Sequence, residues 1–356
     1  MVWLLSLPVW VVVWSFFTKK DSTYKISEKT YMIICSLALI FVMGLRSQES
    51  GSMDTTMYSR MFDTAQKYGE LRNFLESKEV FDVPFLFSEI GFYSCMWAAA
   101  QFLPSMQWVI FITSAFVVFA TAKFISRHSD DPMVSWLVFI CLGLMTFSMN
   151  GMRQALAMSI CLLAYRFVEE KKLFRFLIIV FIAILFHKSA IIFALVYLMR
   201  NMKLDFKSIF IIAIAVTAFL IFAQNFAFLY DDFMGDDYAE GDSFESGGVV
   251  NVLIYLIAII GMLLKHKTLQ SPKLFLSFAL VVIGLSLYMG RYISTQIYER
   301  ASYYFSYFLI LCFPTVLREG DPKVRLWLRT SFAILCIGLF AYRISNSAMS
   351  NFEMFW

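Results

Sequence analysis

The stretch SMNGMRQALAMSICLLAYRF, residues 148–167, decides how the rest of the chain is interpreted. From Ala155 onward it is apolar enough for a helix in hydrocarbon, yet Arg153 and Gln154 stand where the apolar run begins. An ionisable side chain at the edge of a membrane span is costly to bury, so it is a functional candidate by default. The stretch therefore predicts a membrane helix with a functional arginine at one end.

The composition of the whole chain agrees with a membrane protein. Of its 356 residues 60% are hydrophobic and only 16% are charged, whereas soluble proteins average roughly 45–50% apolar and about 25% charged residues. Backbone groups in lipid must be hydrogen-bonded internally, and the alternating pattern of a β-barrel is absent, so the spans are predicted to be helices. We expect an all-α, polytopic integral membrane protein that forms a single membrane domain over residues 1–356.

The apolar runs predict about 12 transmembrane helices. They fall at 1–17, 30–46, 106–124, 132–149, 154–169, 173–187, 189–200, 207–229, 248–264, 273–290, 301–317 and 326–342. Residues 1–17 lack the basic start of a signal peptide and are interpreted as a retained span. Residues 88–103 are apolar enough to cross as well, but a crossing there would put Lys123 and Arg127 on the wrong side. We therefore predict a re-entrant or interfacial helix that is broken by Pro104.

Lys and Arg cluster in alternate loops, which predicts the orientation. By the positive-inside rule, the loops that contain Lys19, Lys123, Lys171, Lys203, Lys265 and Lys323 are cytoplasmic. The opposite side then holds two larger loops: 47–87, with aromatic residues at helical spacing, and 231–246, with seven carboxylates. The rule predicts few arginines on this outer side. Several lie there all the same, namely Arg46, Arg153, Arg291, Arg300 and Arg343.

Arg153 and His187 are the strongest candidates for chemistry on the outer side. Arg153 could simply snorkel to the interface and cap a turn, but an arginine beside Gln154 at a helix start suits an anion, and guanidinium grips phosphate with two hydrogen bonds. His187 lies in LFHKSAII, before Lys188 and Ser189. A lone histidine on an apolar helix is more often a packing residue, yet this one could act as a base, a proton donor or a phosphate ligand.

Two further outer clusters are less specific. Arg46 ends the second span, and Asp54 and Tyr58 follow it at i, i+4 spacing, so a phosphate ligand and a general base are one interpretation and a solvated loop is the other. Arg291, Glu299 and Arg300 form the second cluster. Tyr58, Gln154 and Glu299 are candidates for holding an acceptor. Tyr303 and Tyr304 are predicted to belong to the interfacial aromatic belt.

Cofactor chemistry has no sequence signature in this chain. No Walker loop, G-x-S-x-G elbow, H-E-x-x-H or G-x-G-x-x-G stands in a suitable context, and the D-x-D pattern of nucleotide-sugar transferases is missing. All six cysteines lie in apolar runs without a C-x-x-C pair. We expect no cofactor and no metal, and the net charge of +4 gives no indication of nucleic-acid binding.

Five segments resemble the EpsG family of Wzy-like polysaccharide polymerases in order and spacing. They are GLRSQESGSMDTTMYSRMF, SEIGF, NGMRQALAMSI, LFHKSAIIF and YERASYYF, within residues 30–315. Two positions depart from the family pattern: Ser52 stands where a glycine is usual, and Ile90 where a proline is usual. These departures weaken the roles of Asp54 and Glu89 but leave Arg153 and His187 untouched.

The resemblance implies a C-type glycosyltransferase architecture in a bacterial plasma (inner) membrane. It implies that a polyprenyl-diphosphate-linked glycan is transferred to another lipid-linked repeat unit at the periplasmic or outer face, making O-antigen, capsule or exopolysaccharide. On this basis Arg153 and Arg46 would bind the diphosphate, with Arg291 and Arg300 as second contacts, and His187 or Asp54 would be the base. Membrane lipid, a chain-length regulator and a flippase are further candidate partners.

Three other functions remain open from the sequence. A lipid-linked oligosaccharide flippase also needs basic groups, but distributed along a path through both halves of the chain, often with repeat symmetry. An O-antigen ligase-like transferase uses the same donor chemistry. A structural membrane subunit would not need the outer arginines.

Overall fold

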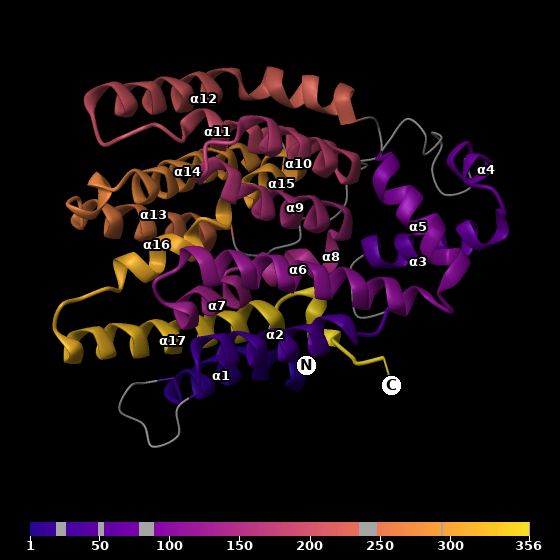
Figure 1. Ribbon diagram of the computed structural model, residues 1–356, viewed down its shortest axis with the longest axis horizontal. Helices are drawn as coiled ribbons and strands as arrows, with labels where there is room; N and C mark the ends of the chain where they lie inside the picture. Colours follow the sequence, from indigo (N-terminus) through magenta and orange to yellow (C-terminus); the bar gives the residue numbers. More distant parts are fainter. Residues whose placement is uncertain (19–25, 49–52, 78–88, 235–247, 293–294, 356) are drawn as a thin grey trace.

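The computed structural model describes residues 1–18, 26–48, 53–77, 89–234, 248–292 and 295–355. Within these ranges the chain is all-α, as predicted, and it contains no β-strand beyond a single antiparallel bridge between Arg46 and Met354. Figure 1 shows the long helices lying roughly along one axis, with α3, α4 and α5 gathered at one end.

The helices of the first half of the chain follow the apolar runs closely. They are α1 (Val2–Phe16), α2 (Glu28–Gly44), α3 (Met53–Lys67), α4 (Leu71–Leu75), α5 (Ile90–Phe102), α6 (Met106–His128), α7 (Pro132–Cys141), α8 (Leu144–Asn150) and α9 (Met152–Glu169). The helix predicted in the outer loop 47–87 is α3, and α5 ends just before Pro104, as expected. Most of the acidic loop 231–246 lies outside the described residues.

The second half begins with a broken pair and continues with longer helices. Its elements are α10 (Leu173–Phe186), the 3₁₀ helix η2 (Lys188–Phe193), α11 (Ala194–Met199), α12 (Phe206–Met234), α13 (Gly248–Leu264), α14 (Pro272–Met289), the 3₁₀ turn η4 (Gly290–Tyr292), α15 (Thr295–Ser306), α16 (Leu309–Val316) and α17 (Pro322–Ser345). The starts of α7 and α17 share one signal: Asp131 and Asp321 cap them, and a proline follows each cap.

Helix length supports a polytopic membrane protein, but not the full number of spans. Among the described residues, Met106–His128, Pro272–Tyr292 and Pro322–Ser345 are long and apolar enough to cross a bilayer, and α7 with α8 adds a fourth if the two count as one span bent by 50°. Other apolar helices, with α12 counted only over Phe206–Phe219, are 10–17 residues long. The prediction of about 12 spans is therefore not confirmed by helix length.

A glycine accounts for the break between α7 and α8. Gly143, between α7 and α8, has a φ of 99°, a left-handed conformation that a side chain would strain. The predicted span 132–149 therefore becomes two helices rather than one. The span predicted at 301–317 is likewise divided into α15 and α16, whereas the boundary predicted between 173–187 and 189–200 is found at His187.

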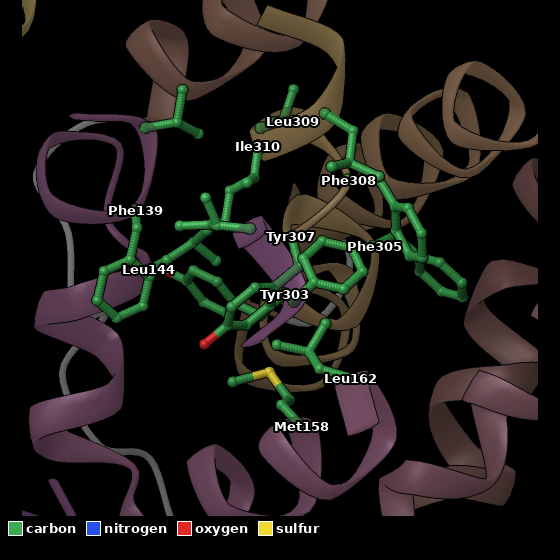
Figure 2. Close-up of a cluster of buried hydrophobic side chains, with 14 of the residues drawn as sticks. Phe139, Leu144, Met158, Leu162, Tyr303, Phe305, Tyr307, Phe308, Leu309 and Ile310 are labelled. Atoms are coloured by element: carbon green, nitrogen blue, oxygen red, sulfur yellow. The ribbon is translucent and has the colours of Figure 1, made fainter. Parts of the chain in front are cut away.

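Helix α9 lies at the centre of the apolar core. It contacts α6, α8, α10 and η2, and Figure 2 shows its Met158 and Leu162 facing Tyr303 and Tyr307 of the α15–α16 region. A second, smaller apolar cluster joins α3 and α5 to the start of α9 through Tyr58, Phe92 and Met152. The polar residues that begin α9 are thus held between two apolar clusters.

Ion pairs join the basic loops at one end of the bundle. Arg127 and Lys273 both approach Glu169 at 3.7 Å, Lys265 pairs with Glu319 at 2.9 Å, and Arg318 pairs with Asp130 at 3.1 Å. We call this the basic end. The outer candidate residues lie at the other end, so the structure separates the two sets of charges, while the side of the membrane that each set faces stays a prediction.

Candidate functional site

The candidate site is built where α5, α9 and η2 meet. Arg153 is the second residue of α9, and Gly151 both ends α8 and precedes α9. Helix α5 approaches this point closely because Gly91 has no side chain: a Cβ there would lie 2.8 Å from both the Cβ and the carbonyl oxygen of Leu185 in α10. The close packing of α5 on α10 places Glu89, just before α5, beside His187, just after α10.

Glu89 bridges the two strongest candidates from the sequence. Arg153 Nη1 donates to Glu89 Oε2 at 2.9 Å and to the hydroxyl of Tyr93 at 2.8 Å. The other carboxylate oxygen, Oε1, lies 3.4 Å from His187 Nδ1 and accepts from the backbone N–H of Lys188 at 3.4 Å. Arg153, Glu89 and His187 are 6%, 2% and 2% exposed. We call these three residues with Tyr93 the Glu89 cluster.

The protonation of His187 follows from its neighbours. The Ser189 backbone N–H donates to His187 Nδ1 at 3.3 Å, and Ser189 Oγ lies 2.8 Å from the same nitrogen. Tyr304 OH contacts Ser189 Oγ at 3.1 Å. We assign the ring proton to Nε2, because Nδ1 accepts from a backbone N–H and a neutral imidazole has one donor and one acceptor nitrogen. Ser189 and Glu89 both approach Nδ1, so they do not form a catalytic triad around the ring, which requires contacts to both nitrogens.

A second ion pair lies next to the Glu89 cluster. Arg300 Nη2 is 3.6 Å from Asp54 Oδ2, and the side chains are 18% and 22% exposed. Gln154 Nε2 donates to the backbone carbonyl of Arg300 at 2.6 Å, which ties this pair to the start of α9. The structure thus brings Asp54, Arg300 and Gln154 together.

Tyr58 connects the two groups electrostatically. Its ring is buried, and burial raises the pKa of its hydroxyl, while the guanidinium groups of Arg153 and Arg300 lower that pKa and the carboxylate of Asp54 raises it further. Tyr58 therefore lies within the fields of both ion pairs. Its phenol is kept neutral and able to donate a hydrogen bond.

Arg291 and Glu299 form a third group, on different partners. Arg291 Nη1 lies 3.2 Å from Glu299 Oε2 and also contacts the hydroxyl of Tyr288. Asn251 donates to that hydroxyl at 2.9 Å and accepts from Arg343. Arg291 and Glu299 are thus each other's partners.

Arg46 has a different environment from the other arginines. It is buried, it donates to the backbone carbonyls of Met43 and Met149, and the bridge to Met354 lies beside it. Met149 belongs to α8, so Arg46 ties the end of α2 to the helix that precedes Arg153. This geometry favours a structural role for Arg46.

Three residues of the site depart from the sequence interpretation. Tyr303 and Tyr304 were expected in the interfacial belt, but both are buried: Tyr303 stacks on Phe147 with ring centroids 4.0 Å apart, and Tyr304 contacts Ser189. Tyr93 was not singled out. Its only sequence signal is its place four residues after Glu89, one helical turn along α5.

Metal binding finds no support among the residues that the structure describes. No three His, Cys, Asp or Glu side chains there are grouped so that they could hold a metal ion. The charged groups near Arg153 are instead arranged as guanidinium–carboxylate pairs. Such an arrangement can bind an anion, shift a proton, or do both.

Comparison with known proteins gives one match. The sequence model of the EpsG family matches residues 29–355, nearly the whole chain. EpsG is a family associated with Wzy-like polymerases, and membership supports a polysaccharide polymerase-like role in general. No curated protein and no solved structure matches the chain.

Proposed function

The chain belongs to the EpsG family, and from this premise we propose that it is a membrane glycosyltransferase that polymerises polyprenyl-diphosphate-linked repeat units. The observation that supports this most is the buried Glu89 cluster beside the Asp54–Arg300 pair. Burying charges is costly even when they are paired, so a buried cluster of charges in a membrane protein indicates a function. The members of this cluster come from segments far apart in the chain. Their position at one end suits an enzyme better than an alternating-access path.

The donor's leaving group gives the arginines their role. The bond between the anomeric carbon and the diphosphate oxygen breaks, negative charge develops on the diphosphate, and preorganised cations in a water-poor site stabilise that charge. We assign Arg153 and Arg300 to this task, with Arg291 as a more distant contribution. The Nε2–H of His187 is a further donor for a phosphate oxygen.

The acceptor hydroxyl needs a base, and we propose Asp54 rather than His187 because of the partners that each residue has. The Nδ1 lone pair of His187 already accepts from Ser189. Asp54 is partly exposed and, within the described chain, pairs only with Arg300. Asp54 therefore takes the proton as the acceptor oxygen bonds to the anomeric carbon. A single displacement of this kind inverts that centre.

The setting of the reaction is part of the proposal. We assign the protein to a bacterial plasma membrane, with about 12 passages of the chain and the Arg153 end at the outer face. The product is O-antigen, capsule or exopolysaccharide. A flippase would supply the lipid-linked unit, and a chain-length regulator would act on the product.

The proposal is tested with purified protein in detergent and synthetic polyprenyl-diphosphate repeat units, without nucleotide and with a chelator. We expect a ladder of products on a gel that is lost in Arg153→Ala. Long-chain product from a folded Arg153→Ala protein would contradict the assignment of Arg153 to the diphosphate. No ladder from the native protein, together with substrate crossing a vesicle membrane in a parallel assay, would identify a flippase instead.

A further inference from the structure

A cavity of about 570 Å³ lies at the basic end, away from the candidate site. It is lined by the end of α1 and the starts of α2, α7 and α17. Helix α2 runs between the cavity and the end of the bundle that holds the candidate site. Glu28 at its start lines the cavity, and Arg46 follows its other end. Its 17 residues span about 25 Å at 1.5 Å per residue. The volume falls within the usual range for small-ligand sites, roughly 300–1,000 Å³.

Most of the charges around the cavity neutralise one another. Asp131 and Arg329 form a two-pronged pair, with Nε–Oδ2 at 2.8 Å and Nη2–Oδ1 at 3.1 Å. Asp130 pairs with Arg318 outside the cavity at 3.1 Å. Within the described chain, Glu28 and Arg325 have no ion-pair partner within 4.0 Å. One carboxylate and one guanidinium are left facing the same space.

The neighbouring surface is apolar. Leu326 lines the cavity and is exposed, and Val324 and the 74%-exposed Trp327 flank it on the first turns of α17. Exposed tryptophan beside charged residues is typical of the boundary between bilayer and water. A ligand seated in the cavity would thus have a charged group inside and hydrocarbon beside it.

We propose that this cavity binds the headgroup of a phospholipid that carries a primary amine. The phosphate would lie against Arg325, whose planar fork suits two phosphate oxygens. The ammonium would donate to Glu28 and to Asp130. A quaternary amine is disfavoured because Tyr31 is the one aromatic residue among the described lining residues, whereas quaternary amines are held in aromatic cages.

The test compares lipid binding directly and does not depend on polymerase activity. Delipidated protein in detergent is titrated with phosphatidylethanolamine, phosphatidylcholine and phosphatidylglycerol that have identical acyl chains, and native mass spectrometry counts the bound lipid. We expect the ethanolamine lipid to bind about tenfold more tightly than the other two, the effect of roughly one charge-assisted hydrogen bond. Glu28→Gln should abolish this preference, whereas Arg325→Gln should weaken the binding of all three lipids, because each of them carries the phosphate.

The matched control is Lys323→Gln, which removes an exposed charge on the same turn of α17 without lining the cavity. It should keep the preference. Equal binding of the three lipids by the native protein, an unchanged preference in Glu28→Gln, or native affinity for all three lipids in Arg325→Gln would overturn the proposal. Displacement of the lipid by equimolar free phosphoethanolamine would also overturn the proposal, because the ligand would then be a soluble zwitterion and not a lipid.

Discussion

Glu89 determines how the two neighbouring candidates are oriented. It holds Arg153 with one carboxylate oxygen and approaches His187 with the other, and all three are almost inaccessible to water. The carboxylate offsets the cost of burying the guanidinium and fixes its direction, so that the cation need not reorganise when charge develops on a substrate. Glu89 is therefore a positioning residue for the proposed reaction.

Glu89→Gln keeps the shape of the side chain and removes its charge. We expect polymerisation to fall by about 100-fold, the usual cost of one preorganised electrostatic contact. The rate of ladder formation, normalised to folded protein, measures the effect.

The control for this variant is Glu76→Gln. The Glu76 carboxylate pairs with Arg72 at 2.8 Å on an exposed turn, where ion pairs contribute about 0–1 kcal/mol. If Glu89→Gln makes chains at the native rate while folded, Glu89 does not position Arg153.

Asp54→Asn separates proton removal from donor binding. As the proposed base, Asp54 should contribute about 10²–10⁴-fold to the rate, so the variant should bind the lipid-diphosphate donor with nearly native affinity and make almost no polymer. Asp63→Asn, at an exposed position of the same helix, should behave like the native protein. An active Asp54→Asn together with an inactive His187→Gln would assign the base to His187.

The sequence predicts the isolated charges of the site better than their partners. Arg153 and His187 are visible because each interrupts an apolar run. Their common partner Glu89 lies 64 positions before Arg153, and no periodicity links the two. Tyr304 was wrongly predicted to lie in the aromatic belt for a related reason. The sequence near a span end looks the same whether its tyrosine faces the interface or, as here, hydrogen-bonds Ser189 inside the bundle.

Among the elements, the contact of α5 with α10 is the one on which the site depends. Gly91→Ala would insert a methyl group 2.8 Å from Leu185 backbone and side-chain atoms, so the two helices must separate. Overpacking of this kind costs about 1–3 kcal/mol. Thermal unfolding in detergent should show a lower midpoint, and activity should fall with it because Glu89 moves away from His187.

Gly338→Ala is the matched control, since Gly338 is also helical and an added Cβ there meets nothing within 4 Å. Its midpoint should stay unchanged or rise, because alanine is the better helix former. Equal midpoints for Gly91→Ala and the native protein would mean that α5 is free to shift.

Hydropathy predicts where helices lie but not where they break. The run 106–124 becomes a single helix, Met106–His128, whereas the apolar run 132–149 is interrupted at Gly143. The difference lies in a single backbone conformation, which an apolar average does not record. Short helices and bends are therefore the part of the fold that the residue pattern could not supply.

The molecule as a whole is divided into two charged ends, and labelling can assign each to a side of the membrane. In a Cys95→Ala background, which removes the exposed cysteine among the six, Gln66→Cys marks the end with α3 and Lys267→Cys marks the basic end. Both positions are exposed. On intact cells, a membrane-impermeant maleimide should label the first and not the second, which should react only after permeabilisation. The reverse pattern would invert the proposed orientation.

The distances along the chain between the members of the Glu89 cluster affect how the protein is made. Glu89 is synthesised 64 residues before Arg153, and His187 comes later still. Until α9 has left the ribosome, the carboxylate lacks its cationic partner Arg153, and hydrocarbon is a costly place for it. A nascent chain that stops before residue 153 thus carries an acidic group that it cannot neutralise. For quality-control proteases, that group would distinguish an unfinished protein from a complete one.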